Sequence, residues 1–263
     1  MREYDNCRFG ARFAEGAEDI ARAQRLRWLA FRAGNGAAGR DGLDADAFDP
    51  LCRHVLIEET RSGALVACFR LLPLARGAEI GRSYAAQYYD LSGLLDFDGP
   101  MAEMGRFCLH PDWHDPDILR VAWAATTRFV DEEGIEMLFG CSSFAGTEAE
   151  VYVDAFAMLK ERHLGPRRWL PRVKAPDVVR FARNLSGRRP DLKRALKAMP
   201  PLLRTYLTMG GWVSDHAVVD TEMATLHVFT GLEIRAVPSG RARALRAIAG
   251  TGPAMARGGG IRA

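Results

Sequence analysis

A β-strand, a helix and a second strand are predicted between Met101 and Phe144, and they constrain the fold of this chain more than any other feature. Met101 to Leu109 lacks helical spacing and is followed by Pro111, which predicts a strand. The helix begins at the N-cap Asp115 with proline next in the chain. Ile135 to Phe139 is a short apolar run, typical of a strand buried in parallel beside the first. This order predicts an α/β fold.

The first of these strands brings three chemically distinct residues together. Glu103 and Arg106 would point to opposite faces of a regular strand, but a β-bulge at Gly105 would bring both to one face. A bulge also leaves backbone N–H groups unpaired, and free donors beside a carboxylate suit a reaction site. The alternative is an ordinary surface ion pair, and the residues leave both interpretations open.

Length and composition bound the class of protein. The chain has 263 residues, of which 48% are hydrophobic and 26% charged, as expected for one large domain or one domain with an insertion. No apolar run approaches the roughly 20 residues that cross a bilayer, and the N-terminus lacks the apolar core of a signal peptide. We therefore expect a cytoplasmic protein.

The cysteines do not predict disulfides or a metal site. Five of them are scattered along the chain, which indicates reduced thiols. Cys52 with His54 and Cys108 with His110 form Cys-x-His pairs, but neither has the spacing of common zinc sites, and we expect no metal. Nothing in the sequence supplies the base that a nucleophilic Cys108 would need.

The remaining elements follow from periodicity and turn residues. The sequence predicts a domain over residues 1–235 and a Gly/Ala/Arg-rich tail over 236–263, in which Pro238 to Ala263 forms a frayed helix and a disordered end. The expected elements of the domain are a strand at Arg8 to Phe13, a helix at Ala17 to Phe31, a glycine-rich loop at Asn35 to Gly42, a hairpin of Arg53 to Glu59 with Ala64 to Leu72, a helix at Glu148 to His163, and strands at Leu202 to Thr208 and His216 to Phe229.

Several sequence words, taken in order, resemble a known superfamily. The words are L-R-W-L-A-F from Leu26, D-A-D-A-F-D from Asp44, C-F-R-L-L from Cys68 and E-M-G-R-F from Glu103. They are similar to the pattern shared by acyl-homoserine-lactone synthases and ornithine N-acyltransferases, which use acyl carrier protein, within the GNAT acyltransferases. The resemblance implies a mixed central α/β sheet with a bulged strand and helices on both faces.

The second half of the chain favours the ornithine branch. L-F-G-C-S-S-F and the late P-P-L-L-R-T-Y-L-T-M-G-G-W-V resemble the ornithine acyltransferases, and the similarity spans most of Arg8 to Ile234. Lactone synthases carry a tryptophan shortly after the phenylalanine that matches Phe31, whereas this chain has R-A-G-N-G. The resemblance therefore implies transfer of a 3-hydroxyacyl chain to the α-amine of L-ornithine.

The segment before the crossover helix bears on the acyl donor. Coenzyme A users place a glycine-rich turn there, where backbone N–H groups hold the pyrophosphate. This chain has P-D-W-H-D-P-D, whose three aspartates would repel a diphosphate. We expect the donor to be carried on the phosphopantetheine of acyl carrier protein, with no permanently bound cofactor.

A strongly basic segment predicts an acidic partner. Residues 160–197 carry thirteen Arg and Lys against three Asp and Glu, a net charge of +10, while the whole chain is only +3. This segment has few aromatic residues and no known nucleic-acid-binding motif, so we do not expect a nucleic-acid partner. We expect a basic helical insertion at about 160–199 that contacts acyl carrier protein or the anionic inner membrane, which would place the protein peripherally on that membrane. The candidate carrier contacts are Arg167, Arg168, Arg172 and Lys174. A solvated basic face is the third interpretation.

The resemblance also implies roles for the catalytic residues. Glu103, directly or through a water, is the candidate general base, and the α-amine that it would deprotonate has a pKa near 8, against about 10 for the δ-amine. Backbone amides from Arg106 to Cys108 would hold the oxyanion, which places Phe107 and Cys108 at the substrate. Arg106 would bind the ornithine carboxylate or fix Glu103.

Four further residues have two interpretations each. Arg27 and Arg70 match family arginines that could bind the carboxylate or fix Glu103. Asp46 and Asp49 could bind the δ-ammonium group, or could belong to a salt-bridge network that closes the N-terminal segment.

Ser142 and Ser143 are the candidate contacts of the pantetheine or acyl chain. For the chain as a whole, two other functions stay open, a lactone synthase that uses S-adenosylmethionine and a non-catalytic basic module on this fold.

Overall fold

The computed structural model describes residues 8–32 and 42–251. Residues 35–41 of the glycine-rich loop and residues 252–263 of the predicted tail lie outside them. The chain forms two compact units. The first comprises Met1–Leu72, Met104–Gly134 and Ser239–Ala263, and the second comprises Pro73–Glu103 and Ile135–Pro238.

The strands of the first unit follow the predicted order. β2 pairs antiparallel with both β1 and β3, and β5 is the neighbour of β3. The predicted hairpin is thus confirmed, although β3 is longer than expected. The bounds are β1 Phe9–Phe13, β2 Arg53–Glu59, β3 Leu65–Leu74 and β5 Met101–Leu109. The residues of β3 after Leu72 and those of β5 before Met104 are counted in the second unit.

Helices pack on both faces of these strands. α1 (Ala17–Phe31) places Ala23 and Leu26 against Leu56 of β2 and Cys68 of β3. α2 (Pro116–Glu132) packs on the opposite face, where Phe129 contacts Phe13, the strand partner of Val55. As predicted, the Asp115 carboxylate caps α2, and Gly134, with φ of 63°, follows its end.

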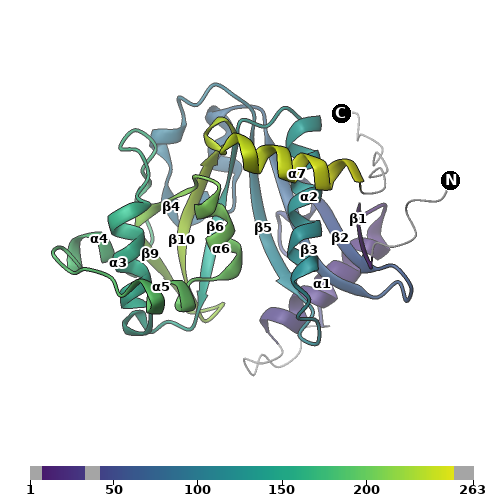
Figure 1. Ribbon diagram of the computed structural model, residues 1–263, viewed down its shortest axis with the longest axis horizontal. Helices are drawn as coiled ribbons and strands as arrows, with labels where there is room; N and C mark the ends of the chain where they lie inside the picture. The colour runs from purple at the N-terminus through teal and green to yellow at the C-terminus, as the bar shows by residue number, and fades with distance from the viewer. Residues whose placement is uncertain (1–7, 33–41, 252–263) are drawn as a thin grey trace. The chain divides into compact units, whose positions relative to one another are not determined.

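The helix predicted after Pro238 is present, and it packs against α2 where fraying was expected. α7 (Ser239–Thr251) runs beside α2 (Figure 1), and Arg246 forms two hydrogen bonds of 2.7 and 2.8 Å with Asp131 of α2. Arg128 also donates to the carbonyl oxygen of the buried Ala249. Ala and Arg favour the helix that the sequence predicted, and the partner helix supplies the packing that composition does not show.

The second unit is built on an antiparallel sheet of order β6-β10-β9-β8. The predicted single strand from His216 to Phe229 is in fact a hairpin, because the chain turns at Thr221–Ala224. The bounds are β6 Met137–Ala145, β8 Val178–Val179, β9 Trp212–Asp220 and β10 Thr225–Glu233. A separate pair joins β4 (Tyr89–Asp90) to β7 (Arg172–Val173).

Helices cover one face of this sheet around Phe144, Leu226 and Val228. They are α3 Val153–Arg162, α4 Phe181–Asn184, α5 Leu192–Ala198 and α6 Pro201–Thr208. α6 replaces the strand predicted at Leu202 to Thr208, because Pro201 occupies the first turn and Leu203 and Leu207 lie one turn apart on its buried side. The basic segment is helical only in part, since Val178 and Val179 pair with β9.

Short 3-10 turns complete the described chain. Five of them belong to the second unit and one, η2 (Asp49–Leu51), to the first. Those of the second unit are η3 Gly77–Arg82, η4 Ala85–Gln87, η5 Ser92–Leu94, η6 Ala149–Tyr152 and η7 Ile234–Ala236. η4 precedes β4 directly and therefore positions Tyr88 and Tyr89.

Candidate active site

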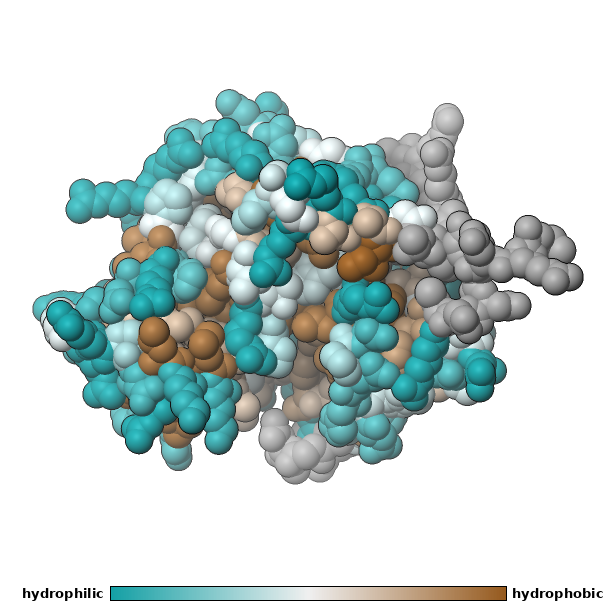
Figure 2. Space-filling view, in the orientation of Figure 1, coloured by the Kyte–Doolittle hydropathy of each residue, from teal (hydrophilic) through white to brown (hydrophobic). Residues whose placement is uncertain are grey.

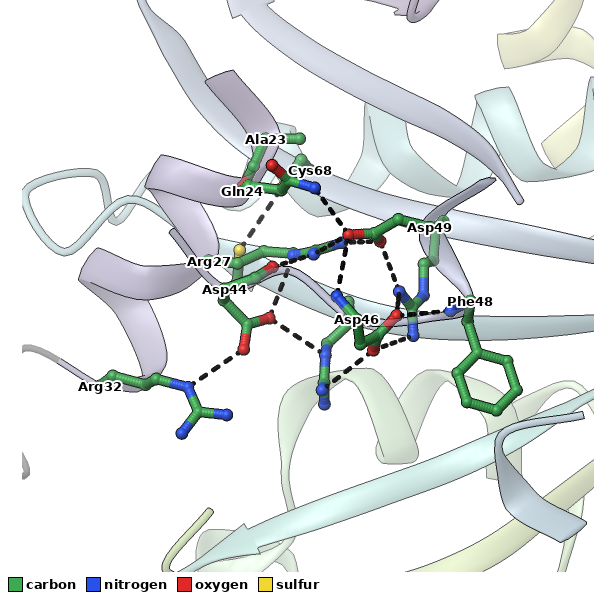
Figure 3. Close-up of polar contacts among 12 residues, drawn as sticks. Ala23, Gln24, Arg27, Arg32, Asp44, Asp46, Phe48, Asp49 and Cys68 are labelled. Carbon is green, nitrogen blue, oxygen red and sulfur yellow. Dashed lines mark hydrogen bonds and ion pairs between the residues drawn. The ribbon is translucent and has the colours of Figure 1, made fainter. Parts of the chain in front are cut away.

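A buried network of three arginines and three aspartates lies in the first unit (Figure 3). Arg27 comes from α1, Arg70 from β3 and Arg106 from β5. The aspartates, Asp44, Asp46 and Asp49, come from the segment that enters β2. Of the two interpretations of Asp46 and Asp49, the structure therefore contains the salt-bridge network.

Asp49 is the centre of the network. Its Oδ1 lies 2.7 Å from Nη1 of Arg27 and 2.5 Å from Nη1 of Arg70. Its Oδ2 accepts from Nη2 of Arg27 at 2.7 Å and from Nε2 of Gln24 at 2.8 Å. The Asp46 backbone N–H also donates to Oδ2, at 3.4 Å. Each oxygen therefore has at least two donors, and a substrate ammonium could reach Asp49 only by displacing one of them.

The other two aspartates extend the network toward Arg106. Asp46 binds Arg70 through both oxygens, at 2.6 and 2.7 Å, and lies 3.2 Å from Nη2 of Arg106. Oδ2 of Asp44 lies 3.2 Å from the Nε atoms of both Arg27 and Arg106. These two contacts lack hydrogen-bond geometry and act through charge. The side chains of Asp46 and Arg106 are 21% and 13% exposed, and those of Arg27, Arg70, Asp44 and Asp49 at most 5%.

Charge pairing keeps Asp46 and Asp49 ionised. Burial alone would raise the pKa of Asp49, but hydrogen bonds from Arg27 and Gln24 and the nearby arginine charges hold it well below its usual value. Burial would also raise the pKa of Asp46, but Arg70 and Arg106 outweigh this effect and lower it. Burial lowers the pKa of His54, which contacts the Asp49 carbonyl oxygen at 3.0 Å, so this imidazole is neutral near pH 7.

Glu103 is held by the turn that precedes β4 in the second unit. Its two carboxylate oxygens accept hydrogen bonds from the backbone N–H groups of Tyr84 and Ala85, each at 2.7 Å, and the side chain is buried. These donors fix the orientation of the carboxylate. In the same strand, β5, the positive φ of 53° belongs to Arg106 and not to the neighbouring Gly105, where the bulge was predicted.

The next two residues of β5 pack inside the first unit. The Phe107 ring stacks on Phe69 with centroids 5.6 Å apart. Cys108 is buried, with its Sγ 3.6 Å from Sγ of Cys68. The contact with Cys68 and burial raise the pKa of the Cys108 thiol well above its usual value, which disfavours the thiolate that a nucleophile requires.

The two serines of β6 lie on opposite faces of the sheet. Ser142 is buried on the helix-covered face and accepts a hydrogen bond of 2.9 Å from the Thr230 hydroxyl. Ser143 is exposed on the other face, directly opposite His227 of β10. Of the two, Ser143 is therefore the one available to a ligand.

The four candidate carrier contacts are exposed in the second unit. Arg168 stacks over the Trp169 ring at 4.5 Å and lies 3.9 Å from Glu233. Lys174 donates to the Ala86 carbonyl oxygen at 2.6 Å. Among the described residues, no three His, Cys, Asp or Glu side chains gather as metal ligands would.

Sequence reasoning missed two parts of this arrangement. Asp44 stands two residues before Asp46, and the spacing D-x-D-x-x-D opposite three arginines could have indicated a third carboxylate. The cluster of Tyr89, His216 and His227 in the second unit was also missed, because its residues come from separate strands and share no motif.

Comparison with known proteins assigns the family. The acetyltransferase (GNAT) domain profile matches residues 26–124, which include the whole network and Glu103. The chain is 36% identical over 236 residues to the L-ornithine N(alpha)-acyltransferase of Rhodobacter capsulatus, covering 86% of this chain and 90% of that protein. The chain belongs to the L-ornithine N(alpha)-acyltransferase family. This family member is therefore an acyltransferase.

Other relatives of this acyltransferase agree. The L-ornithine N(alpha)-acyltransferase of Rhizobium meliloti is 29% identical over 242 residues, which cover 88% of this chain and 81% of that protein. A solved CoA-dependent acyl-homoserine lactone synthase matches 97% of this chain and 94% of its own with a TM-score of 0.50 and 14% sequence identity. That likeness concerns the fold alone. Within the described residues, no helix has the length and apolar character needed to cross a membrane.

Proposed function

We propose that this acyltransferase moves a 3-hydroxyacyl chain from acyl carrier protein to the α-amine of L-ornithine, giving lyso-ornithine lipid. The observation that carries the proposal is the 36% identity, over nearly the whole chain, to a relative named for that amino acid and that nitrogen. The lactone-synthase alternative has support from the fold only.

The least buried ion pair of the network suits an amino-acid acceptor. Arg106 and Asp46 are 3.2 Å apart, and they are the most exposed of the three arginines and three aspartates. Arg32, which pairs with Asp44 at 3.1 Å at the edge of the network, is 26% exposed. A zwitterionic amino acid carries the same two charges, so Arg106 would bind the ornithine carboxylate and Asp46 the δ-ammonium group. Asp49 would then hold the guanidinium groups of Arg27 and Arg70 in place through its hydrogen bonds to them.

The chemistry needs one proton acceptor and a leaving thiol. The α-ammonium loses a proton to Glu103 through a water, and the free amine attacks the thioester carbonyl carbon. The two backbone donors on Glu103 hold the carboxylate in a fixed orientation for this role. As the C–N bond forms and the C–S bond breaks, the carrier thiolate takes up a proton. Backbone amides near Arg106 would hold the oxyanion.

The start of α2 favours a carrier-protein donor. Asp115 accepts the Asp117 N–H at 2.9 Å and also pairs with Arg8 at 2.7 Å. Pro116 contributes no N–H. This helix end therefore presents a carboxylate where a coenzyme A pyrophosphate would require donors.

One assay tests the proposed reaction. Purified protein is incubated with 3-hydroxyacyl carrier protein and either ornithine, lysine, glutamine or S-adenosylmethionine, and products are identified by mass spectrometry. We expect Nα-acylated ornithine from wild type and none from Glu103→Gln at unchanged unfolding temperature. A lactone product, or no product from any acceptor, contradicts the proposal.

The exposed arginines and lysine before β8 would dock the acidic carrier protein. Reversing Arg167, Arg168, Arg172 and Lys174 to Glu should raise the KM for acyl carrier protein at least about tenfold, while the KM for ornithine stays constant. Reversal of Arg120, which is exposed on α2 in the first unit, is the matched control. Equal KM values for the carrier in both variants would exclude this docking surface.

A different surface of the second unit fits an anionic membrane. On α5, Leu192 is 40% exposed and Leu196 is 48% exposed, while Val151 of the adjacent η6 is 63% exposed. Figure 2 shows apolar side chains grouped among hydrophilic ones in the region where Figure 1 draws α3 and α5. Residues 183–197 have a net charge of +5. Protruding leucines among basic residues are typical of peripheral membrane contact.

Vesicle sedimentation tests the membrane contact. Wild type should sediment with phosphatidylglycerol vesicles and not with phosphatidylcholine vesicles, and L192S/L196S should lose most of the binding. If the double variant binds as wild type does, this surface is not the contact.

A further inference from the structure

His227 of β10 carries a buried lone pair that no described residue satisfies. The Tyr89 hydroxyl donates its single proton to the His227 carbonyl oxygen at 2.8 Å. In its second contact, at 3.1 Å, the hydroxyl must therefore accept from Nδ1–H of the same histidine. This tautomer leaves Nε2 as an acceptor. Nε2 has no hydrogen-bond partner among the residues that the structure describes, although the side chain is only 2% exposed.

The imidazole is neutral and can only accept at this nitrogen. Burial lowers the pKa of His227 to about 4, with a smaller contribution from the charge of His216. A buried acceptor that lacks a donor is costly, because folding removes its hydrogen bond to water. The atom therefore requires a donor that the described chain does not supply, such as a ligand N–H or O–H group.

The face of the sheet around His227 can be reached by a ligand. His227 stands directly opposite Ser143, so the two side chains share one face, and Ser143 is exposed. The half-buried Tyr88 ring lies 5.0 Å from the imidazole. Farther along the same face, Phe229 stacks on Phe139 at 5.8 Å. The lone pair is thus set in aromatic and apolar surroundings.

We propose that Nε2 of His227 accepts a hydrogen bond from a hydroxyl group on the acyl chain, and that this contact selects 3-hydroxyacyl over unsubstituted acyl donors. The proposal rests on the proposed function. A hydrocarbon chain with one hydroxyl matches an apolar face with one acceptor. The pantetheine arm fits less well, because its amides also bring carbonyl groups that this face would leave without donors. A site that hydrogen-bonds a substrate hydroxyl discriminates strongly against the analogue that lacks it.

His216 provides a matched control. It is also buried, its ring lies 5.3 Å from Tyr89, and its Nε2 has no hydrogen-bond partner among the described residues. Its Nδ1 is 2.6 Å from Oδ1 of Asp215. Unlike His227, which stands opposite the exposed Ser143, His216 has no exposed residue opposite it in the strand pairing of the described residues. Replacing His216 should therefore change stability without changing the preference for the hydroxyl.

The test measures binding without chemistry. Two acyl-pantetheine analogues with a thioether in place of the thioester, one with and one without the 3-hydroxyl, are titrated into the full-length protein by calorimetry. We expect wild type to bind the hydroxylated analogue at least about tenfold more tightly. His227→Leu should reduce the ratio to about twofold or less. His227→Gln, whose amide oxygen can replace Nε2, should retain most of it, and His216→Leu should retain all of it.

Each other outcome overturns the proposal. Equal affinities in wild type would mean that Nε2 is satisfied by a buried water, and this comparison decides even if His227→Leu does not fold. A ratio unchanged in His227→Leu, or lost equally in His216→Leu, would remove the specific role of His227. A failure of the proposed function looks different, because acyl transfer to ornithine would be absent while the binding ratio persists.

Discussion

At the scale of single residues, Asp49 decides the stability of the network. Asp49→Asn leaves Arg27 and Arg70 buried with one anionic partner fewer, and breaking a buried ion pair from one side typically costs about 3–5 kcal/mol. We expect a loss of that size in the free energy of unfolding, measured by urea denaturation. The control is Asp117→Asn, which removes an exposed pair with Arg120 and should cost less than about 1 kcal/mol. Equal losses in the two variants would contradict the structural role.

Asp46 should behave differently from Asp49, because its side chain is 21% exposed and Arg70 keeps Asp49 as a second partner. We expect Asp46→Asn to raise the KM for ornithine about tenfold or more, since a charged hydrogen bond contributes about 1.5–3 kcal/mol. The KM for the acyl carrier should not change, and unfolding should shift by less than it does in Asp49→Asn. Steady-state kinetics with each substrate varied in turn measures this. A change confined to stability would assign Asp46 to the network alone.

The sequence could identify most members of the network but not their contacts. Arg27, Asp46, Asp49, Arg70 and Arg106 each lie in a word that resembles the family pattern. Which arginine meets which aspartate depends on how α1, β3 and β5 pack, and a one-residue change in register would exchange partners. The lone pair of His227 could not be predicted, because burial without a partner is a property of the folded chain.

At the scale of elements, local signals worked where they were strong. α1 and α2 both begin where predicted: α2 has the capping residue Asp115 and apolar spacing, whereas α1 has apolar spacing without a side-chain cap. α6 was predicted as a strand, although Pro200 and Pro201 mark a helix start and Leu203 and Leu207 have helical spacing. The turn between β9 and β10 has no glycine or proline, so nothing local marked it.

α7 offers a test at this scale. Removing residues 239–263 uncovers the side of α2 that contacts Ala249, and we expect the free energy of unfolding to fall by about 1–3 kcal/mol. Hydrogen exchange in α2 should increase at the same time. Arg246→Gln is the control, because it removes only an exposed pair with Asp131 and should cost less than about 1 kcal/mol. A truncation without effect on α2 would show that the tail does not pack.

At the scale of the whole molecule, buried neutral histidines link stability to pH. The pKa of His227 is about 4 in the folded protein against 6.5 for an unperturbed histidine, and burial lowers the pKa of His54 in the same direction. Between these values the unfolded chain binds more protons than the folded one, so acid favours unfolding. The contribution of His227 is complete above about pH 6.5 and is lost as the pH falls toward 4, for a total of about 3 kcal/mol.

Urea denaturation at pH 7.5 and pH 5 tests this linkage. We expect wild type to lose stability on acidification, and His227→Gln to lose about 2 kcal/mol less over that interval, because glutamine does not titrate. The titratable groups around the ring are Tyr88, Tyr89 and His216, and Asp215 lies beside His216, so His216→Gln must be compared in parallel. If the substitution of His227 leaves the pH dependence unchanged, its imidazole is already protonated or solvated in the folded state. That result would also remove the neutral acceptor on which selection of the acyl hydroxyl depends.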